Sequence, residues 1–205
     1  MSEPADRSEC ALFTIGHSNL PLETFLELLR ANRIAVLADT RSQPYSRFAP
    51  HFNARELDGA VMKVGLRYLF LGKELGGRPE EAEFYDAEGY VLYGRLAESP
   101  QFLSGMAQLE AEAAQRRVAI LCSEENPSVC HRRLLITRVL TARGVPVCHI
   151  RGDGRVQTEA ELLAEDEAEK NRGGQQSLFD AEEVTEWKSL RSVSPRRPPP
   201  SSSER

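Results

Sequence analysis

The chain has 205 residues, of which 40% are hydrophobic, 7% aromatic and 28% charged. This composition is typical of a globular protein and disfavours a collagen, a coiled-coil rod or a wholly disordered chain. Because 26 Lys and Arg residues stand against 31 Asp and Glu residues, the net charge is −5, and no overall positive field attracts nucleic acid or an anionic membrane.

Short β-rich runs alternate with amphipathic helical patterns along most of the chain. After residues 1–10, which we expect to be disordered, this alternation predicts a single α/β domain over residues 11–170, with a mostly parallel sheet of about five strands flanked by helices. Strands are predicted at 12–16, 34–39, 67–71, 118–122 and 145–150. Helices are predicted around 22–29, 54–64, 85–97, 102–116, 134–140 and 159–170. Residues 171–205, rich in Gly, Gln, Ser and Pro, predict a flexible, disordered C-terminal tail.

No apolar run approaches the roughly 18 residues that a membrane-spanning helix needs, and residues 1–10 are polar. We therefore expect a cytoplasmic protein. In that compartment Cys10, Cys122, Cys130 and Cys148 are expected to be reduced, which favours thiol chemistry or metal binding over a disulfide framework. Cys10 lies on an end that we expect to be frayed, so it is not a site candidate.

Polar residues directly follow four of the predicted strands. The carboxyl ends of parallel strands lie at one edge of the sheet, where ligands of α/β proteins bind. We therefore expect these side chains to gather there. They are His17 and Asn19 after the first strand, Asp39 and Arg41 after the second, Cys122 and Glu124 after the fourth, and His149 at the end of the fifth.

The segment 118–135 is the most informative part of the sequence. Asn126 is a suitable cap and Pro127 a suitable first-turn residue of a helix, which places Cys130, His131 and Arg132 near the end of its first turn. A helix N-terminus beside an imidazole and a guanidinium favours the thiolate, so Cys130 is the first candidate nucleophile. Cys122 is the alternative nucleophile, or a resolving or ligating partner. The proton handlers would be His131, His17 or Glu124. In the alternative interpretation, both cysteines are small buried hydrophobic residues.

A zinc site is disfavoured by the spacing of the soft ligands. Cys122, Cys130, His131, Cys148 and His149 follow none of the usual paired spacings, and adjacent strand residues point to opposite faces. We therefore expect neither a metal nor another cofactor.

The loop after the second predicted strand carries two guanidinium groups, from Arg41 and Arg47. Together with Arg132 they suit bidentate binding of a phosphate or carboxylate. An equally weighted alternative is an ion pair between Asp39 and Arg41 that only fixes the loop. The full set of predicted substrate-binding residues is Asn19, Asp39, Arg41, Ser46, Arg47, Arg132 and His149.

The sequence resembles the domain of unknown function 488 family. The matching motifs are 13–19 (FTIGHSN), 39–46 (DTRSQPYS), 75–78 (LGGR), 121–124 (LCSE) and 130–132 (CHR). This resemblance implies a compact α/β domain whose signature residues include those gathered above, but it implies no established activity. The strand–cysteine–helix arrangement is also loosely similar to rhodanese-like and cysteine-phosphatase sites. It departs from them because Cys122 and Arg132 are ten positions apart.

The predicted tail contains a separate motif, QQSLF, at residues 175–179. It is similar to the short peptide by which bacterial polymerases and repair proteins bind the sliding clamp, with Gln175, Leu178 and Phe179 as the anchors. A disordered segment with two adjacent apolar side chains can insert into a preformed pocket. The alternative is that Leu178 and Phe179 pack back on the domain.

These features support two hypotheses of different class. The first is a cysteine-dependent enzyme that acts on an anionic substrate, with nucleic-acid-derived compounds among the candidates. The second is a non-catalytic module that binds a nucleotide or DNA end and is recruited to replication or repair machinery through its tail. Thiol reactivity distinguishes them, because a nucleophile needs a thiolate and a binding pocket does not.

Overall fold

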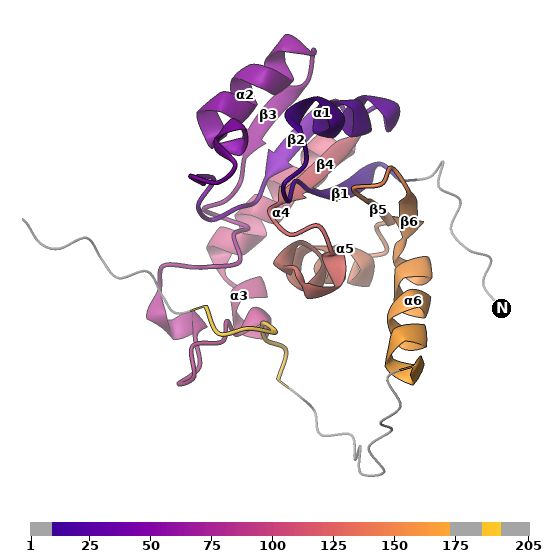
Figure 1. Ribbon diagram of the computed structural model, residues 1–205. Coiled ribbons are helices and arrows are strands. Elements are labelled where there is room, and N and C mark those ends of the chain that lie inside the picture. Colours follow the sequence, from indigo (N-terminus) through magenta and orange to yellow (C-terminus); the bar gives the residue numbers. More distant parts are fainter. Residues whose placement is uncertain (1–9, 173–185, 194–205) are drawn as a thin grey trace, which may run out of the picture.

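The computed structural model describes residues 10–172 and 186–193. A six-stranded sheet runs through the middle of the domain in the order β3-β2-β4-β1-β5-β6 (Figure 1). Its first five strands in sequence are parallel, and β6 pairs antiparallel with β5. The strands are β1 (Leu12–Gly16), β2 (Val36–Asp39), β3 (Arg67–Phe70), β4 (Val118–Cys122), β5 (Val147–Ile150) and β6 (Val156–Thr158).

Helices cover both faces of the sheet. Alternate strand residues point to opposite faces, so each strand contributes to two apolar layers. One layer packs against α1 (Leu22–Ala31) and α2 (Ala54–Lys63), and the other against α3 (Tyr93–Ala97), α4 (Pro100–Ala113) and α5 (Arg138–Ala142). The helix α6 (Glu159–Arg172) follows β6 at the edge of the sheet (Figure 1). Among the described residues, no helix is both long and apolar enough to cross a bilayer.

The predicted α/β class and mostly parallel sheet are confirmed, with two differences in the elements. The short edge strand β6 was not predicted. The helix predicted over 85–97 exists only as α3, because the Asp86 carboxylate accepts hydrogen bonds from the amides of Glu88 and Tyr90 and closes a turn. An Asp side chain that satisfies nearby amides competes with helix formation.

The chain after β4 also differs from the predicted single helix. Asn126 does cap a turn, accepting from the Ser128 amide, but the turn is a 3₁₀ turn that spans only Pro127–Val129. Cys130 is extended, with φ −112° and ψ 141°, and a π-helix, Arg132–Thr137, leads into α5. Cys130 therefore lies at a break between two helical segments rather than inside a first turn.

The expectation that all four cysteines are reduced is wrong for two of them. Cys10 and Cys148 form a disulfide, whereas Cys122 and Cys130 are free. Cys10 is 2% exposed rather than frayed, because it lies two residues before β1, whose Phe13 lies in register with Cys148 on β5. Two residues separated by 138 positions are thus brought together by strand pairing.

A C-terminal strap, residues 186–193, packs against the domain although it lies within the predicted flexible tail. The Trp187 indole donates to the Leu134 carbonyl and lies beside the Tyr93 ring. Ser189 exchanges hydrogen bonds with the backbone of Val91. The strap is thereby fixed beside α3 (Figure 1).

Candidate functional site

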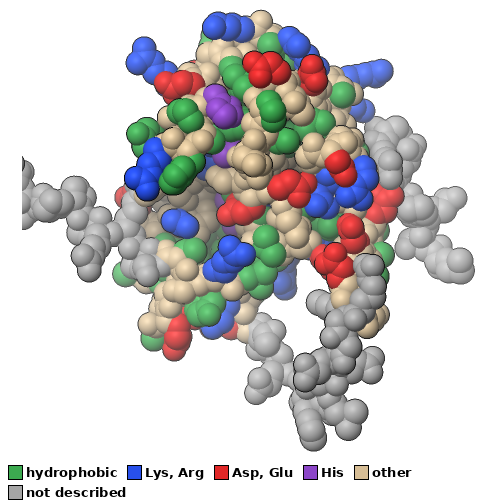
Figure 2. Space-filling view, in the orientation of Figure 1, with side chains coloured by type: hydrophobic (Ala, Val, Ile, Leu, Met, Phe, Trp, Pro, Cys, Tyr) green, Lys and Arg blue, Asp and Glu red, His purple; other side chains and the backbone are tan. Residues whose placement is uncertain are grey.

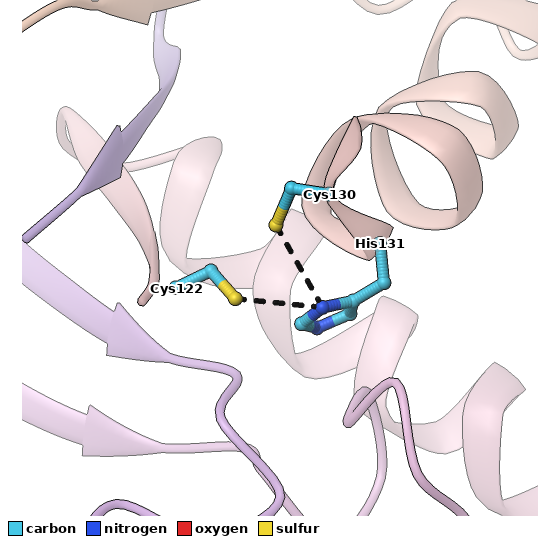
Figure 3. A group of neighbouring side chains, drawn as sticks. All are labelled: Cys122, Cys130 and His131. Atoms are coloured by element: carbon cyan, nitrogen blue, oxygen red, sulfur yellow. Dashed lines mark hydrogen bonds between the residues drawn. The ribbon is translucent and has the colours of Figure 1, made fainter. Parts of the chain in front are cut away.

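Three residues with sulfur or imidazole side chains meet beyond the end of β4. Cys122 ends that strand, Cys130 lies at the break described above, and His131 follows it (Figure 3). His131 Nδ1 lies 3.5 Å from Cys122 Sγ and 3.9 Å from Cys130 Sγ. The Glu124 carboxylate completes the group, with Oε2 2.9 Å from Cys122 Sγ and 3.2 Å from Cys130 Sγ. We call these four residues the dithiol cluster.

The imidazole of His131 is oriented by its second nitrogen. Nε2 lies 3.2 Å from the Thr40 carbonyl oxygen, which can only accept, so Nε2 carries the proton. Nδ1 therefore points toward the two sulfurs. The other side of the ring lies against Gly77, where an added Cβ would come within 2.7 Å of Cγ of His131. The close approach of this ring thus requires a glycine at position 77, the second glycine of the LGGR motif.

The electrostatic surroundings distinguish the two thiols. Burial opposes ionisation of Cys130, but the hydrogen bond from Cys122 and the positive charges of Arg132 and His131 bring the pKa of Cys130 well below its ordinary value. The same hydrogen bond, together with burial, raises the pKa of Cys122 well above its ordinary value. Although burial also opposes it, the Cys130 thiolate raises the pKa of His131. The pair thus holds one negative charge, centred on Cys130.

Arg132 supports the loop that carries Glu124. Its guanidinium is 1% exposed and donates to the backbone carbonyls of Glu124 and Glu125 and to the Thr14 hydroxyl. Thr14 in turn bonds to Nδ1 of His149 at 2.9 Å. Because its donors are directed at backbone and hydroxyl oxygens in the interior, Arg132 holds the loop rather than lining a cavity.

His149 lies within this interior network, away from the dithiol cluster. Its Nε2 lies 2.8 Å from Glu159 Oε2, and Glu159 also pairs with Arg133. Burial lowers the pKa of His149, with Glu159 acting in the opposite direction. The structure therefore does not bring His149 to the cavity described below.

Asp39 and Arg41 form the brace that the sequence left as one of two alternatives. The Arg41 guanidinium donates to both Asp39 carboxylate oxygens, and the Tyr68 hydroxyl donates to Asp39 Oδ2. The remaining Nη1 of Arg41 donates to His17 Nε2 at 3.1 Å. His17 is therefore the Nδ1–H tautomer, whose proton goes to the Ser18 carbonyl. Burial, followed by the charge of Arg41, lowers the pKa of His17 to about 4.

A cavity of about 390 Å³ opens beside the dithiol cluster. Cys122, Glu124 and His131 belong to its wall, while Cys130 lies behind them. Three guanidinium-bearing residues line it, namely Arg41, Arg78 and Arg191, together with Tyr93 and, from the strap, Ser189, Leu190 and Val193. In the space-filling view, basic side chains surround a hollow on this face of the molecule (Figure 2).

The other predicted site residues lie apart from this cavity. Asn19 is exposed and accepts from the Ser18 hydroxyl, and the Ser46 hydroxyl accepts from the amides of Phe48 and Ala49 in a turn. Arg47 is exposed and stacks over the Phe48 ring. Gln175, Leu178 and Phe179 lie outside the described residues.

Sequence reasoning missed Arg191, Arg78 and Tyr93 as cavity residues. Arg78 follows the two glycines of the LGGR motif, in the loop after a predicted strand. That position could have indicated that Arg78 lies at the same edge of the sheet as the other site residues. No sequence signal places Arg191 there, because the strap is held by contacts between distant parts of the chain.

The donor types of the dithiol cluster also suit a metal ion. The ligand atoms of Cys122, Cys130 and His131 lie within 4.8 Å of one another. The carboxylate of Glu124 adds a fourth donor near both sulfurs. Sulfur and imidazole nitrogen are ligands that Zn²⁺ accepts.

The fold and the site define an α/β protein with a pair of free thiols at the carboxyl edge of a parallel sheet. Residues 21–139, more than half of the chain, match the family described as domain of unknown function DUF488, and the protein belongs to that family. The matched region contains Arg41, Cys122, Cys130 and His131, whereas His17, His149 and the strap lie outside it. Neither the curated proteins nor the solved structures gave a significant match.

Proposed function

We propose that this protein is a cysteine-dependent enzyme that acts on a small anionic substrate bound in the cavity beside the dithiol cluster. One observation carries the proposal. Two free thiols contact Nδ1 of a single oriented imidazole, beside a cavity lined by three guanidinium-bearing residues. A thiol beside an imidazole that is fixed by a third group is the arrangement of an activated cysteine nucleophile.

The positions of the two sulfurs support a division of roles. Cys122 belongs to the cavity wall, which makes it the sulfur that a substrate can reach. Cys130 is 1% exposed and stands behind it, which suits a partner that holds negative charge or resolves an intermediate. In the proposed step, the neutral Cys122 thiol gives its proton to the Cys130 thiolate, and Cys122 Sγ forms a bond to the electrophilic atom. The bond to the leaving group breaks, and the departing electron pair takes the proton from Cys130.

The guanidinium groups support an anionic substrate. Arg41 is held by Asp39 and His17, so it contributes mainly a fixed positive field. Within the described part of the chain, no ion pair engages the guanidiniums of Arg78 and Arg191. A cavity of this size accommodates a small molecule, and guanidiniums suit carboxylate or phosphate. We propose a phosphate-bearing, nucleic-acid-derived compound as the substrate class.

The charge preference of alkylation tests this proposal without knowledge of the substrate. We would measure the rates at which anionic iodoacetate and neutral iodoacetamide modify Cys122 in chelator-treated native protein, reading each cysteine by peptide mass spectrometry. The ratio of the two rates should favour iodoacetate more at Cys122 than in N-acetylcysteine. Removing one guanidinium, in Arg78→Ala or Arg191→Ala, should slow iodoacetate about fivefold, the factor for ~1 kcal/mol of screened attraction, and leave iodoacetamide unchanged.

Arg47→Ala is the matched control, because Arg47 is an exposed guanidinium outside the cavity lining. It should change neither rate. His131→Gln should slow both reagents, since it removes the imidazole that stabilises the thiolate charge. If Cys122 reacts only after unfolding, the enzyme proposal fails and the non-catalytic binding module is favoured. If the arginine variants leave the ratio unchanged, the anionic substrate class is wrong.

We further propose that the tail motif at residues 175–179 binds the bacterial sliding clamp. The support is the sequence alone, namely a glutamine followed by an adjacent Leu178 and Phe179. The double variant Leu178→Ala with Phe179→Ala should lose clamp capture in a pull-down while its melting temperature stays the same. A shifted melting temperature with unchanged capture would instead indicate that the two side chains pack on the domain.

A further inference from the structure

The ligand atoms of Cys122, Cys130 and His131 lie within 4.8 Å of one another, and the Glu124 carboxylate lies beside the two sulfurs. Cys122 Sγ and Cys130 Sγ lie 3.5 and 3.9 Å from His131 Nδ1 (Figure 3). Glu124 Oε2 lies 2.9 and 3.2 Å from the two sulfurs. A tetrahedral Zn²⁺ ion with bonds of about 2.3 Å to sulfur and about 2.05 Å to nitrogen holds these ligands about 3.6 Å apart. The sulfur–nitrogen separations therefore match a zinc site to within a few tenths of an ångström. The carboxylate oxygen, at 2.9 and 3.2 Å from the sulfurs, would need to withdraw slightly.

The hydrogen bonding of His131 supports the same assignment. Its Nε2–H is directed at the Thr40 carbonyl, which leaves Nδ1 on the side of the sulfurs as the nitrogen for a metal ion, whose binding would displace any proton there. Histidine ligands of metal ions commonly donate their second N–H to a backbone carbonyl or carboxylate, which fixes the tautomer and the ring plane. The ring is thus oriented before any ion arrives.

The charge of the cluster also calls for a cation. Two ionisable thiols and a carboxylate converge, while the nearby Arg132 guanidinium is engaged by backbone carbonyls. Glu124 is exposed and lies in the cavity wall, whereas the sulfurs are 4% and 1% exposed. An ion entering from the cavity would meet the carboxylate first and then the two sulfurs. Soft thiolate and imidazole donors select zinc over magnesium or calcium.

We propose that Cys122, Cys130 and His131, with Glu124 as the fourth ligand, form a binding site for a soft divalent metal ion of the Zn²⁺ class. The bound ion occupies both sulfurs and so blocks alkylation or substrate attack at Cys122. Only this blocking of substrate attack rests on the proposed function. Metal binding itself does not depend on it.

Cobalt substitution gives a direct optical test. The native protein is treated with a chelator, passed through a desalting column and titrated with Co²⁺. Binding to the cluster should give a thiolate-to-cobalt charge-transfer band and the intense visible bands of tetrahedral coordination, at one ion per chain. Zn²⁺ should then abolish both. Because Cys10 and Cys148 are bonded to each other, the charge-transfer band reports Cys122 and Cys130.

Variants and the wild type each provide a separate check. Cys130→Ser should reduce the charge-transfer band to about half, since one of two sulfurs is lost, and His131→Gln should weaken Co²⁺ binding. His51→Gln, an imidazole outside the cluster, is the matched control and should bind as the wild type does. Should a variant not fold, competition between the wild type and a chromophoric chelator for Zn²⁺ gives the affinity directly.

The outcomes separate this inference from the proposed function. Absence of the charge-transfer band with excess Co²⁺, or the pale spectrum of six-coordinate cobalt, overturns the metal site even if Cys122 remains reactive. A strong band together with an inert Cys122 in the metal-free protein supports the metal site and refutes the enzyme. A strong band and a reactive Cys122 that Zn²⁺ protects from iodoacetamide supports both.

Discussion

Gly77→Ala and Gly59→Ala are the same chemical change at two positions with opposite expected effects. At Gly77 the new Cβ would lie 2.7, 2.9 and 3.0 Å from three atoms of His131. Carbon atoms pack best at about 3.5–4.0 Å, so the imidazole must move. At Gly59, inside α2, the new Cβ has no atom within 4 Å.

The magnitudes follow from these contacts. Overpacking costs about 1–3 kcal/mol, and the lower entropy of the unfolded alanine chain offsets about 0.4–1 kcal/mol, so Gly77→Ala should destabilise the protein by about 1–2 kcal/mol. Gly59→Ala should stabilise it by about 0.5–1 kcal/mol, because alanine is the better helix former. Urea unfolding followed by circular dichroism measures both values.

The site provides a second readout for the same pair. If the imidazole moves, Nδ1 leaves its position between the sulfurs, and Cys122 should be alkylated more slowly in Gly77→Ala than in the wild type. Gly59→Ala should react at the wild-type rate. Equal stability changes in the two variants, or an unchanged alkylation rate in Gly77→Ala, would refute the argument that this glycine exists to admit His131.

Three further predictions concern other parts of the fold. Burial lowers the pKa of His17 to about 4, so the unfolded chain takes up the proton first as the pH falls. The free energy of unfolding should therefore fall by about 2 kcal/mol between pH 7 and pH 5. In metal-free protein, His17→Gln should remove that part of the dependence of stability on pH. Titration of the unfolded, unreduced protein with a thiol reagent should find two free thiols. Cys10→Ser removes the disulfide to Cys148, which closes a loop of 138 residues. In the chain-entropy account, this loss should lower the free energy of unfolding by up to about 5 kcal/mol. Trp187→Ala should release the strap and, like Arg191→Ala, slow iodoacetate while iodoacetamide reacts as before.

The predicted strands show how much of the fold is local information. The strands at 12–16 and 118–122 coincide with β1 and β4, because buried parallel strands appear as short apolar runs. Those at 34–39 and 145–150 begin two residues later than predicted, at Val36 and Val147. The edge strand β6 has three residues, too few for a period to be recognised. The Asp86 turn replaced helix where one side chain satisfied two amides.

The candidate site was predicted in part by a rule of topology. Residues that end parallel strands gather at one edge, which brings Cys122, Glu124 and Arg41 to the cavity wall. The same rule does not say which way a side chain turns. It therefore could not distinguish residues that line the cavity from His149, whose side chain lies in the interior network. Nor could it show that Arg132 is directed at the backbone of the loop that carries Glu124 rather than at the cavity.

The sequence by itself determined the alternation of strands and helices, the sheet edge at which polar residues collect, and the presence of two cysteines and a histidine near that edge. These follow from hydrophobic periodicity and chain order, which are local properties. Only the tertiary structure decided that Cys122 and Cys130 share one imidazole, that Cys10 reaches Cys148, and that the strap brings Arg191 to the cavity. Each of these depends on strand register or on packing between distant segments. These features are not local properties of the sequence, so hydrophobic periodicity does not reveal them.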